Sequence, residues 1–270
     1  MNGIDPIYTK VIAIAKEAGD AIMNIYNKEY VIEKKQDNSL LTAADLAANT
    51  IIIAGLKNIS AHPILSEEVK DTLERLSHEF VWIVDPLDGT SDFIKKNGEF
   101  SVMIGLVQNN TPIFGLSYEP ATQKCYYAQK GIGAFLLETG KEVQKLHVSD
   151  ITNVTQMTVI SSRSHPEKDS IAKKLGITKQ ILSGGIGVKI GKMIEKKADI
   201  YYNTSSYTSI WDTCAPHCII EEAGGKMTDL NGNSLLYNTK ETKNIHGVLA
   251  TNGCVHESIV KDVATSSPLS

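Results

Sequence analysis

Cysteine, excess basic charge and long apolar runs are all scarce in this sequence. Four cysteines in 270 residues are too few and too scattered for a disulfide framework, which predicts a reducing compartment; they are Cys125, Cys214, Cys218 and Cys254. A formal net charge of −4 and a pI near 6.0 argue against nucleic acid or an anionic membrane surface as the main partner. The longest apolar runs, such as TIIIAGL, fall far short of the roughly 20 residues that a membrane helix needs.

Signals for sorting and for tethered domains are also lacking. The first residues, MNGIDPIYTK, contain no basic segment followed by an apolar one, and the last, SSPLS, match no familiar address, so we expect a cytoplasmic protein. Hydrophobic residues make up 42% of the chain and charged residues 21%, as in soluble globular proteins. Without repeats, low-complexity tracts or a Pro/Ser-rich linker, the parts of the chain are expected to pack together.

The pattern of the first half predicts helices mixed with strands. Residues 7–27 carry apolar side chains at helical spacing, and 41–59 predict a second helix, opened by Thr42 with Asp45 three residues later. The other segments are β-rich and predict short strands that end in acids or turn at Asn and Gly: 62–68, 79–86, the hairpin 99–120 and the pair within 124–137.

From about residue 140 the pattern changes to alternating strands and helices. The alternating segments are 157–165, 169–176, 179–185, 188–198, 199–204 and 213–225. Such alternation is typical of α/β folds, in which helices cover a partly parallel sheet. The sequence therefore predicts a second half of α/β type.

Three carboxylates follow a predicted buried strand in the segment VWIVDPLDGTSDF. Asp85, Asp88 and Asp92 have no Lys or Arg beside them until Lys95. Asp, Pro and Gly are the commonest turn residues, so a plain turn is one interpretation. Two carboxylates about 4 Å apart, however, repel by roughly 4 kcal/mol at an effective dielectric near 20. The cluster must be splayed into water, protonated or neutralised by a cation, and oxygen-only ligands suit a hard ion such as Mg²⁺.

Other acids could complete such a set. Glu67 and Glu68 follow an apolar strand as Asp85 does, and if the two strands are neighbours their carboxyl ends bring the acids together. Each acid also has a simpler explanation. The Ser-Glu-Glu run could be a solvated turn, Asp212 begins a helix whose dipole favours an acid, and Asp45 suits a capping box.

Three further patterns carry polar residues, glycine or sulfur. The segment ILSGGIGVKIGKM fits neither of the common glycine-rich phosphate loops, so its spacing favours a strand-to-helix turn. The segment SSRSHPE could be only a polar loop before a helix. Cys214, His217 and Cys218 share a helix, but a zinc site needs a fourth ligand and normally a loop, so packing is the better interpretation.

Taken together, these motifs resemble those of the inositol monophosphatase superfamily of Mg²⁺-dependent, lithium-sensitive phosphatases. The superfamily motifs are LSEE, WIVDPLDGTSDF and WDTCAPHCIIEEAGG, in this order. Within it the chain is most similar to the 3′(2′),5′-bisphosphate nucleotidases, through LTAADLAA, SRSH, GGIGVK and GGKMTDLNGN, over roughly residues 8–255. The resemblance implies a layered αβαβα sandwich: a metal-binding α+β half over 1–140, a substrate-recognising α/β half over 141–270, and the active site between them.

The resemblance also implies roles for single residues around two or three Mg²⁺ ions. The ligands would be Glu67, Asp85, the backbone carbonyl of Leu87, Asp88 and Asp212. Asp85 would bridge two ions, which explains why its carboxylate cannot be spared. Thr90, paired with Asp45, would orient or deprotonate the attacking water, and Glu67 would contribute to a third ion. No nucleophilic Ser or Cys is required, because phosphoryl transfer relies on positioning and charge.

The substrate residues implied by the resemblance come from both halves: Asp88, Gly89, Thr90, Ser162, His165, Gly185, Lys189 and Asp212. Gly185 would approach a nucleotide by its backbone, and Lys189 would pair with a phosphate as a point charge. One departure concerns the residues after Asp-Gly-Thr. Bisphosphate nucleotidases usually carry Lys-Glu there, whereas this chain has Ser91 and Asp92, which removes a positive charge close to the metals.

The predicted function is hydrolysis of the 3′-phosphate of adenosine 3′,5′-bisphosphate to AMP and phosphate, with the sulfated form of this nucleotide as a further substrate and Li⁺ as inhibitor. An inositol mono- or polyphosphate phosphatase is the alternative enzyme, because it would share the metals and differ in the second half. A catalytically silent nucleotide or metal sensor on the same fold would lack a ligand. None is missing among Glu67, Asp85, Asp88, Thr90 and Asp212.

Overall fold

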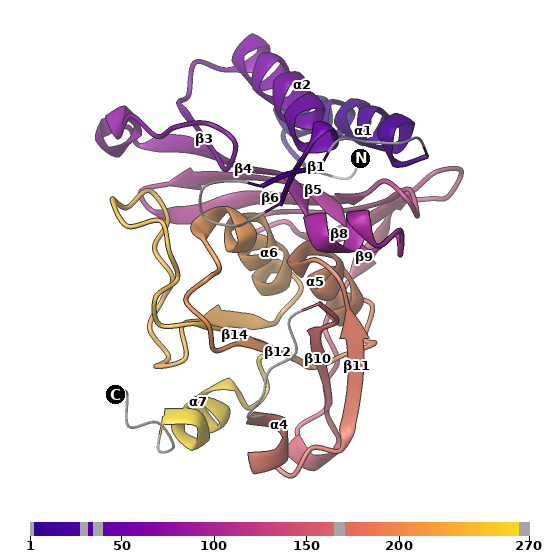
Figure 1. The fold of residues 1–270 in the computed structure, drawn as a ribbon. Helices are drawn as coiled ribbons and strands as arrows, with labels where there is room; N and C mark the ends of the chain where they lie inside the picture. The colour runs from indigo at the N-terminus through magenta and orange to yellow at the C-terminus, as the bar shows by residue number, and fades with distance from the viewer. Residues whose placement is uncertain (1–2, 28–31, 35–39, 165–170, 265–270) are drawn as a thin grey trace.

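The chain folds into five layers of helices and sheets (Figure 1). The computed structural model describes residues 3–27, 32–34, 40–164 and 171–264. The layers are, in order, helices α1 (Pro6–Tyr26) and α2 (Ala43–Ile59), a seven-stranded sheet, helices α5 (Ile186–Ile194) and α6 (Ile210–Glu222), a five-stranded sheet, and helices α4 (Ile171–Lys174) and α7 (His256–Ala264). The predicted αβαβα sandwich is therefore confirmed. Within the described ranges, no helix is long and apolar enough to cross a membrane.

The first sheet follows chain order, β3-β4-β5-β6-β7-β8-β9. Its strands span Ile64–Ser66, Phe80–Asp88, Ser101–Gln108, Thr111–Glu119, Lys124–Gln129, Gly133–Glu138 and Gln144–Leu146. β3 and β4 run parallel, and each later pair is antiparallel. Asn109 and Asn110, both with positive φ, form the turn between β5 and β6, as two-residue hairpin loops require. The predicted hairpin is confirmed, with Thr111 and Pro112 inside the strand.

Strand β4 explains why the run before Asp85 is continuously apolar. Trp82 and Val84 lie in the hydrophobic cluster formed with α1 and α2, whereas Val81 and Ile83 lie in the cluster formed with α6. Successive side chains of a strand point to opposite faces. Because helices cover both faces of this sheet, every position of the strand needs an apolar side chain until the chain reaches the junction with the second half.

The second sheet has the order β11-β10-β12-β14-β13. Its strands span Thr158–Ser162 (β10), Lys179–Ser183 (β11), Ile200–Asn203 (β12), Lys226–Thr228 (β13) and Val248–Thr251 (β14). β10 is parallel to β11 and β12, and β14 is antiparallel to both of its neighbours. One face packs against α5 and α6, and the other contributes to the cluster that contains Ile171 of α4 and Ile259 of α7. The predicted strand–helix alternation is confirmed from β10 to α6.

The remaining elements are short: β1 (Ile32–Lys34), β2 (Leu40–Thr42), η1 (Glu74–Ser77), α3 (Thr90–Ile94) and η2 (Val154–Gln156). Helix α2 begins directly after Thr42, whose side chain lies outside the described residues, so its capping role stays a prediction. The division of the chain at residue 140 also stays a prediction, and the last strand of the first sheet lies just beyond it, at Gln144–Leu146.

Candidate active site

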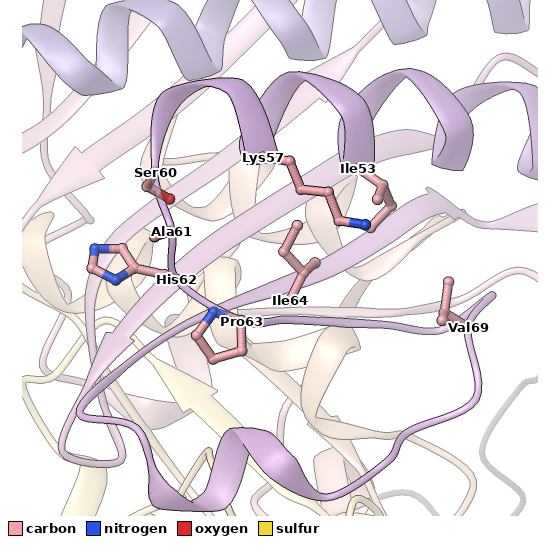
Figure 2. A pocket seen from close by; sticks show the side chains of 8 residues that line it. All are labelled: Ile53, Lys57, Ser60, Ala61, His62, Pro63, Ile64 and Val69. Atoms are coloured by element: carbon pink, nitrogen blue, oxygen red, sulfur yellow. The ribbon is translucent and has the colours of Figure 1, made fainter.

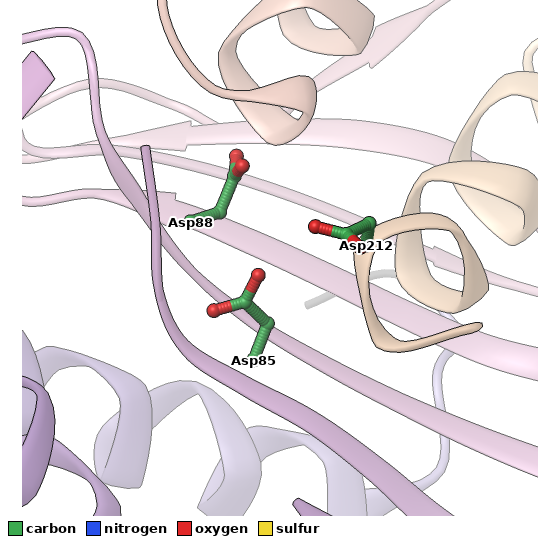
Figure 3. Close-up of side chains that lie close together, drawn as sticks. All are labelled: Asp85, Asp88 and Asp212. Atoms are coloured by element: carbon green, nitrogen blue, oxygen red, sulfur yellow. The ribbon is translucent and has the colours of Figure 1, made fainter. Parts of the chain in front are cut away.

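Three carboxylates converge between the end of β4 and the beginning of α6 (Figure 3). Asp85 and Asp88 belong to β4 and Asp212 to the first turn of α6, and one carboxylate oxygen from each lies within 4.8 Å of the others. Asp85 and Asp88 are buried, with 1% and 6% of their surface exposed, and Asp212 is partly buried. The fold therefore joins three of the predicted metal ligands into one cluster.

The irregular end of β4 brings Asp85 and Asp88 to the same place. β4 pairs with β5 regularly up to Asp85, and pairing resumes at Asp88 after a shift in register. Between them, the Leu87 N–H donates to Asp85 Oδ1 at 3.0 Å. The strand extends beyond its predicted end at Pro86, because the irregular stretch accommodates a residue without an N–H. Gly89 then turns the chain with a φ of 87°, which glycine adopts without strain.

Asp88 is held by three hydrogen bonds, two of them from the beginning of α5. The Ile186 N–H donates to its Oδ1 at 3.0 Å, the Gly187 N–H to its Oδ2 at 2.8 Å, and the Ser101 hydroxyl to its Oδ2 at 3.0 Å. Gly185 leaves no room for a side chain, since an added Cβ would lie 2.2 Å from Asp88 Oδ2. The glycine-rich segment therefore receives a carboxylate of the protein itself at a helix N-terminus.

Asp212 is oriented by the residue that precedes its helix. The Ser209 N–H donates to Asp212 Oδ2 at 2.5 Å, and the Asp212 N–H donates to the Ser209 carbonyl at 3.1 Å. The helix dipole also favours an acid at this position. Both interpretations made from the sequence therefore apply at once: Asp212 lies in the first turn of α6, where the helix dipole favours an acid, and it belongs to the acidic cluster.

Burial raises the pKa values of all three carboxylates, and neighbouring acids add to this effect at Asp85 and Asp212. Burial, then the charges of Glu67, Asp88 and Asp212, hold the pKa of Asp85 well above its ordinary range. Burial and Glu67 raise the pKa of Asp212 to about 8. Burial raises the pKa of Asp88, opposed by the charge of Lys189 and by the N–H donors. Such a cluster favours the binding of protons or cations, and its oxygen-only donors fit a hard divalent metal.

Glu67 and Asp45 act on the cluster through their charges, both of which raise the pKa of Asp85. β3 runs parallel beside β4 with Ser66 opposite Val84, and the Glu67 N–H donates to the Val84 carbonyl at 3.2 Å. The expected meeting of the two strands' carboxyl ends is therefore confirmed. Asp45 is buried in the first turn of α2.

The predicted catalytic hydroxyl lies beside the predicted carbonyl ligand. Thr90, the first residue of α3, donates from Oγ1 to the Leu87 carbonyl at 3.1 Å. This hydrogen bond places a hydroxyl and a carbonyl oxygen together at the end of β4. The pairing of Thr90 with Asp45 stays a prediction, as do the metal-binding role of Leu87 and the substrate contact of Gly89.

The predicted substrate residues Ser162 and Gly185 lie at or just after the ends of the parallel strands β10 and β11. Ser162 ends β10, paired with Ser183 at the end of β11. Gly185 precedes α5, and its N–H donates to the Glu99 carbonyl at 3.0 Å. His165 lies outside the described residues. The contacts of these residues with a substrate stay predictions.

Lys189 occupies an interior position. Only 3% of its surface is exposed, and its ammonium group donates to the Gly184 carbonyl and lies 5.5 Å from the centre of the Tyr201 ring. Burial lowers the pKa of Lys189, while the charges of Asp88 and Asp92 oppose that shift. In this structure Lys189 offsets the negative charge of Asp88, and its pairing with a substrate phosphate stays a prediction.

Some residues that shape this site carry no recognisable sequence signal. The Glu99 carboxylate accepts hydrogen bonds from Lys192 at 2.7 Å and from Arg163 at 2.9 Å, and so connects the segment before β5 with α5 and the loop after β10. Arg163 thereby helps to hold the loop after β10 in place. Lys243, from a long loop, donates to the Ser209 hydroxyl at 3.0 Å. These contacts join segments that are distant in the chain, so no local sequence pattern predicts them.

A cavity of about 380 Å³ lies elsewhere, between α2 and the chain leading into β3 (Figure 2). Ile53 and Lys57 of α2 line it together with His62, Pro63 and other residues near them. None of the acids of the cluster lines this cavity. Chemistry therefore points to the carboxylates and not to this hollow as the active site.

Cys214 and Cys218 belong to α6 and pack into the interior of the protein, as predicted. Both are buried in hydrophobic clusters, and burial raises the pKa of each thiol. His217 is hydrogen-bonded through Nδ1 to the Tyr237 hydroxyl at 2.9 Å, and its Nε2 lies 3.2 Å from Glu221 Oε1. These two contacts indicate a structural role for His217.

Comparisons with known proteins agree with this geometry. The model of the inositol monophosphatase family matches residues 4–267. The chain belongs to the inositol monophosphatase family. Within this family, the protein named 3′(2′),5′-bisphosphate nucleotidase CysQ from Salmonella typhimurium is 38% identical to it over 241 residues, which cover 86% of this chain and 94% of the relative. The resemblance found in the sequence is thereby confirmed.

Solved structures of the inositol monophosphatase family have the same fold. CysQ from Bacteroides thetaiotaomicron superposes with a TM-score of 0.75 at 33% identity, over 90% of this chain and 96% of that one. An IMPase/NADP phosphatase in complex with NADP and Ca²⁺ superposes with a TM-score of 0.82 at 20% identity, over 97% and 96% of the two chains, and so supports the fold alone. Proteins of this family use divalent metals, and Asp85, Asp88 and Asp212 form a cluster that could bind one.

Proposed function

We propose that this protein is a phosphatase that removes the 3′-phosphate of adenosine 3′,5′-bisphosphate, giving AMP and phosphate. The observation that carries the proposal is the convergence of Asp85, Asp88 and Asp212, in a chain that is 38% identical to a protein named as a bisphosphate nucleotidase. A phosphate dianion can approach three carboxylates only if cations lie between them. The acidic cluster therefore suits metal-dependent hydrolysis of a phosphate ester.

Mg²⁺ is the metal of the proposal, with two or three ions in each site. The residues that would hold it are Glu67, Asp85, the Leu87 carbonyl, Asp88 and Asp212. These groups offer only oxygen atoms. Mg²⁺ prefers oxygen ligands, whereas transition metals commonly bind nitrogen and sulfur. When bound, divalent ions polarise the phosphoryl oxygens and lower the pKa of water. Li⁺ is the expected inhibitor.

The residues of the chain orient the reactants. Asp88 cannot turn away from the site, because three hydrogen bonds hold its carboxylate. Thr90, whose hydroxyl lies at the Leu87 carbonyl, would hold the attacking water together with Asp45. The proposal requires no covalent intermediate, since positioning and charge supply most of the catalysis of phosphoryl transfer.

The nucleotide would lie between the two halves. Its contacts in the proposal are Asp88, Gly89, Thr90, Ser162, His165, Gly185, Lys189 and Asp212. Residues from the ends of β4 and β10 and from the first turns of α5 and α6 would then surround one substrate, as expected for ligands bound at the carboxyl ends of strands. A cytoplasmic location and activity on the sulfated nucleotide stay predictions.

Phosphate release tests the proposal. Adenosine 3′,5′-bisphosphate and inositol 1-phosphate are compared as substrates with Mg²⁺, with and without Li⁺, and Asp88→Asn serves as the control that removes a ligand. We expect at least tenfold higher kcat/KM for the nucleotide, inhibition by Li⁺, and loss of activity in the variant. Equal or higher turnover of inositol 1-phosphate would assign the alternative enzyme, whereas nucleotide binding without turnover would assign a sensor.

A further inference from the structure

A bisphosphate substrate carries a second anionic group that the acidic cluster does not bind. The basic side chains around the junction of the two halves differ in how far they are already neutralised. Lys192 and Arg163 both pair with Glu99. Lys95 donates to the Ser164 hydroxyl, which in turn donates to the Asp92 carboxylate. Each of these chains of contacts ends on an anion.

Lys243 differs from Lys192 and Arg163 because, among the described residues, its ammonium group donates to neutral oxygens and not to a carboxylate. Its ammonium group lies 3.0 Å from the Ser209 hydroxyl and 3.4 Å from the Tyr207 carbonyl. In the part of the chain that the structure describes, no ion pair joins it to a carboxylate. The side chain is exposed to solvent. The charge of Lys243 acts on Asp212, whose pKa it lowers, but no carboxylate contacts the ammonium group directly among the described residues, so an anionic ligand can still approach it.

The backbone around Lys243 is fixed against the beginning of α6. The Ile210 N–H donates to the Thr242 carbonyl at 2.8 Å, and the Asn244 N–H donates to the Thr208 carbonyl at 2.9 Å. The Asn244 side chain adds a bond of 2.9 Å to the Ser209 carbonyl. The loop thus holds the lysine beside Ser209, whose own N–H orients Asp212.

One aromatic ring lies near this cation, and the backbone of a second aromatic residue contacts it. The Lys243 ammonium lies 6.0 Å from the centre of the partly buried Trp211 ring, and Tyr207, whose carbonyl it contacts, has 86% of its surface exposed. A cation beside aromatic surface suits a ligand that combines a phosphate with a ring. Trp211 directly precedes Asp212 in the first turn of α6, so this cation lies at the helix end that carries the third carboxylate of the acidic cluster.

We propose that Lys243 is a specificity-determining residue that binds the second phosphate of a bisphosphate substrate, at the Asp212 side of the site. This inference rests on the proposed function for the identity of the nucleotide. It does not depend on Lys189, whose ammonium is buried and donates to the Gly184 carbonyl. Lys243 would therefore favour bisphosphates over monophosphates without taking part in the chemical step.

The test compares kcat/KM for adenosine 3′,5′-bisphosphate with kcat/KM for adenosine 3′-monophosphate, which lacks the second phosphate. We expect Lys243→Met to lower the ratio of the two values about tenfold, mainly by raising the KM of the bisphosphate. A single hydrogen-bonded contact between a cation and a phosphate changes affinity by about tenfold. Lys243→Arg keeps the charge and should keep the ratio within about threefold. Lys240→Met, at an exposed lysine of the same loop, is the matched control and should leave it unchanged.

An unchanged ratio in Lys243→Met would overturn the inference. If the Mg²⁺ concentration for half-maximal activity shifts while the ratio stays the same, Lys243 acts only through Asp212. If the parent protein does not hydrolyse the nucleotide, the proposed function fails separately, and the same ratio is measured with inositol 1,4-bisphosphate and inositol 1-phosphate.

Discussion

The carboxylate of Asp88 accepts a hydrogen bond of 2.8 Å from the backbone N–H of Gly187. A candidate metal ligand on β4 is thereby held by α5, an element of the second half of the chain. Because the two halves share this contact, a change in the glycine-rich segment should act on the metal site before it acts on the substrate.

Replacement of Gly185 by Ala tests this coupling. The added Cβ would lie 2.2 Å from Asp88 Oδ2, and the carboxylate cannot move without losing hydrogen bonds from α5. We expect kcat/KM to fall at least about 100-fold, because a small misplacement of a catalytic group has effects of that order. Steady-state kinetics at saturating Mg²⁺ measures this fall in kcat/KM.

Gly131→Ala is the matched control for this substitution. Gly131 has a φ of 79°, and an added Cβ meets open space. Ala there should cost roughly 1 kcal/mol of unfolding free energy through backbone strain and leave kcat/KM unchanged. Full activity in Gly185→Ala would contradict the steric role given to this glycine.

Asp85→Asn should separate activity from stability. Asn keeps the side-chain oxygen that accepts the Leu87 N–H and removes a buried charge that Glu67, Asp88 and Asp212 all repel. Without metal, we expect the variant to resist thermal or urea unfolding better than the parent, by on the order of 1 kcal/mol or more. Phosphatase activity should fall by at least about a thousandfold. If the metal-free variant is less stable than the parent, repulsion among the acids is not what mainly destabilises the metal-free fold.

Divalent metal should stabilise the parent protein by mass action. A ligand that binds only the folded state adds about 2.7 kcal/mol at 100 times its Kd. Calorimetry in EDTA and then in rising Mg²⁺ should therefore show a Tm that increases with metal concentration and returns when EDTA is added again. Asp212→Asn should respond much less at the same concentrations. Equal metal-dependent shifts in the parent and in Asp212→Asn would place the bound metal away from the acidic cluster.

The sequence predicts those parts of the fold whose signal is local. The run of apolar residues before Asp85 indicates a strand buried on both faces, and the helix that starts near Asp212 has apolar residues around its whole surface because it lies between two sheets. Strands such as Gln144–Leu146 and Lys226–Thr228 have three residues each, too few for a periodic pattern. Tertiary contacts with neighbouring strands define them.

The site shows the same division. The acids Asp85, Asp88 and Asp212 stand in recognisable motifs, and the fold brings them together into a cluster that could bind a metal. The hydrogen bonds that hold Asp88, and the position of Lys243 beside Ser209, depend on how distant segments pack. No spacing along the chain encodes such contacts, so they appear only in three dimensions.

His256 should make the stability of the protein depend on pH. This side chain is 3% exposed, its Nε2 lies 2.9 Å from the Thr228 hydroxyl, and its Nδ1 lies 2.9 Å from the Thr251 hydroxyl. Since the Thr228 hydroxyl already donates to the Asp229 carbonyl, Nε2 carries the proton of a neutral ring. Burial lowers the pKa of His256 from 6.5 to about 4.

Between these two values the unfolded chain binds a proton that the folded protein does not. His256 therefore lowers the unfolding free energy as pH falls, by roughly 2 kcal/mol from pH 7 to pH 5. Urea unfolding of the parent and of His256→Gln at both pH values, with EDTA present, measures this contribution. The buried acids act with the opposite sign but equally in both proteins, so the parent should lose about 2 kcal/mol more than the variant. An equal change in the two proteins would mean that the buried ring is already protonated at pH 5.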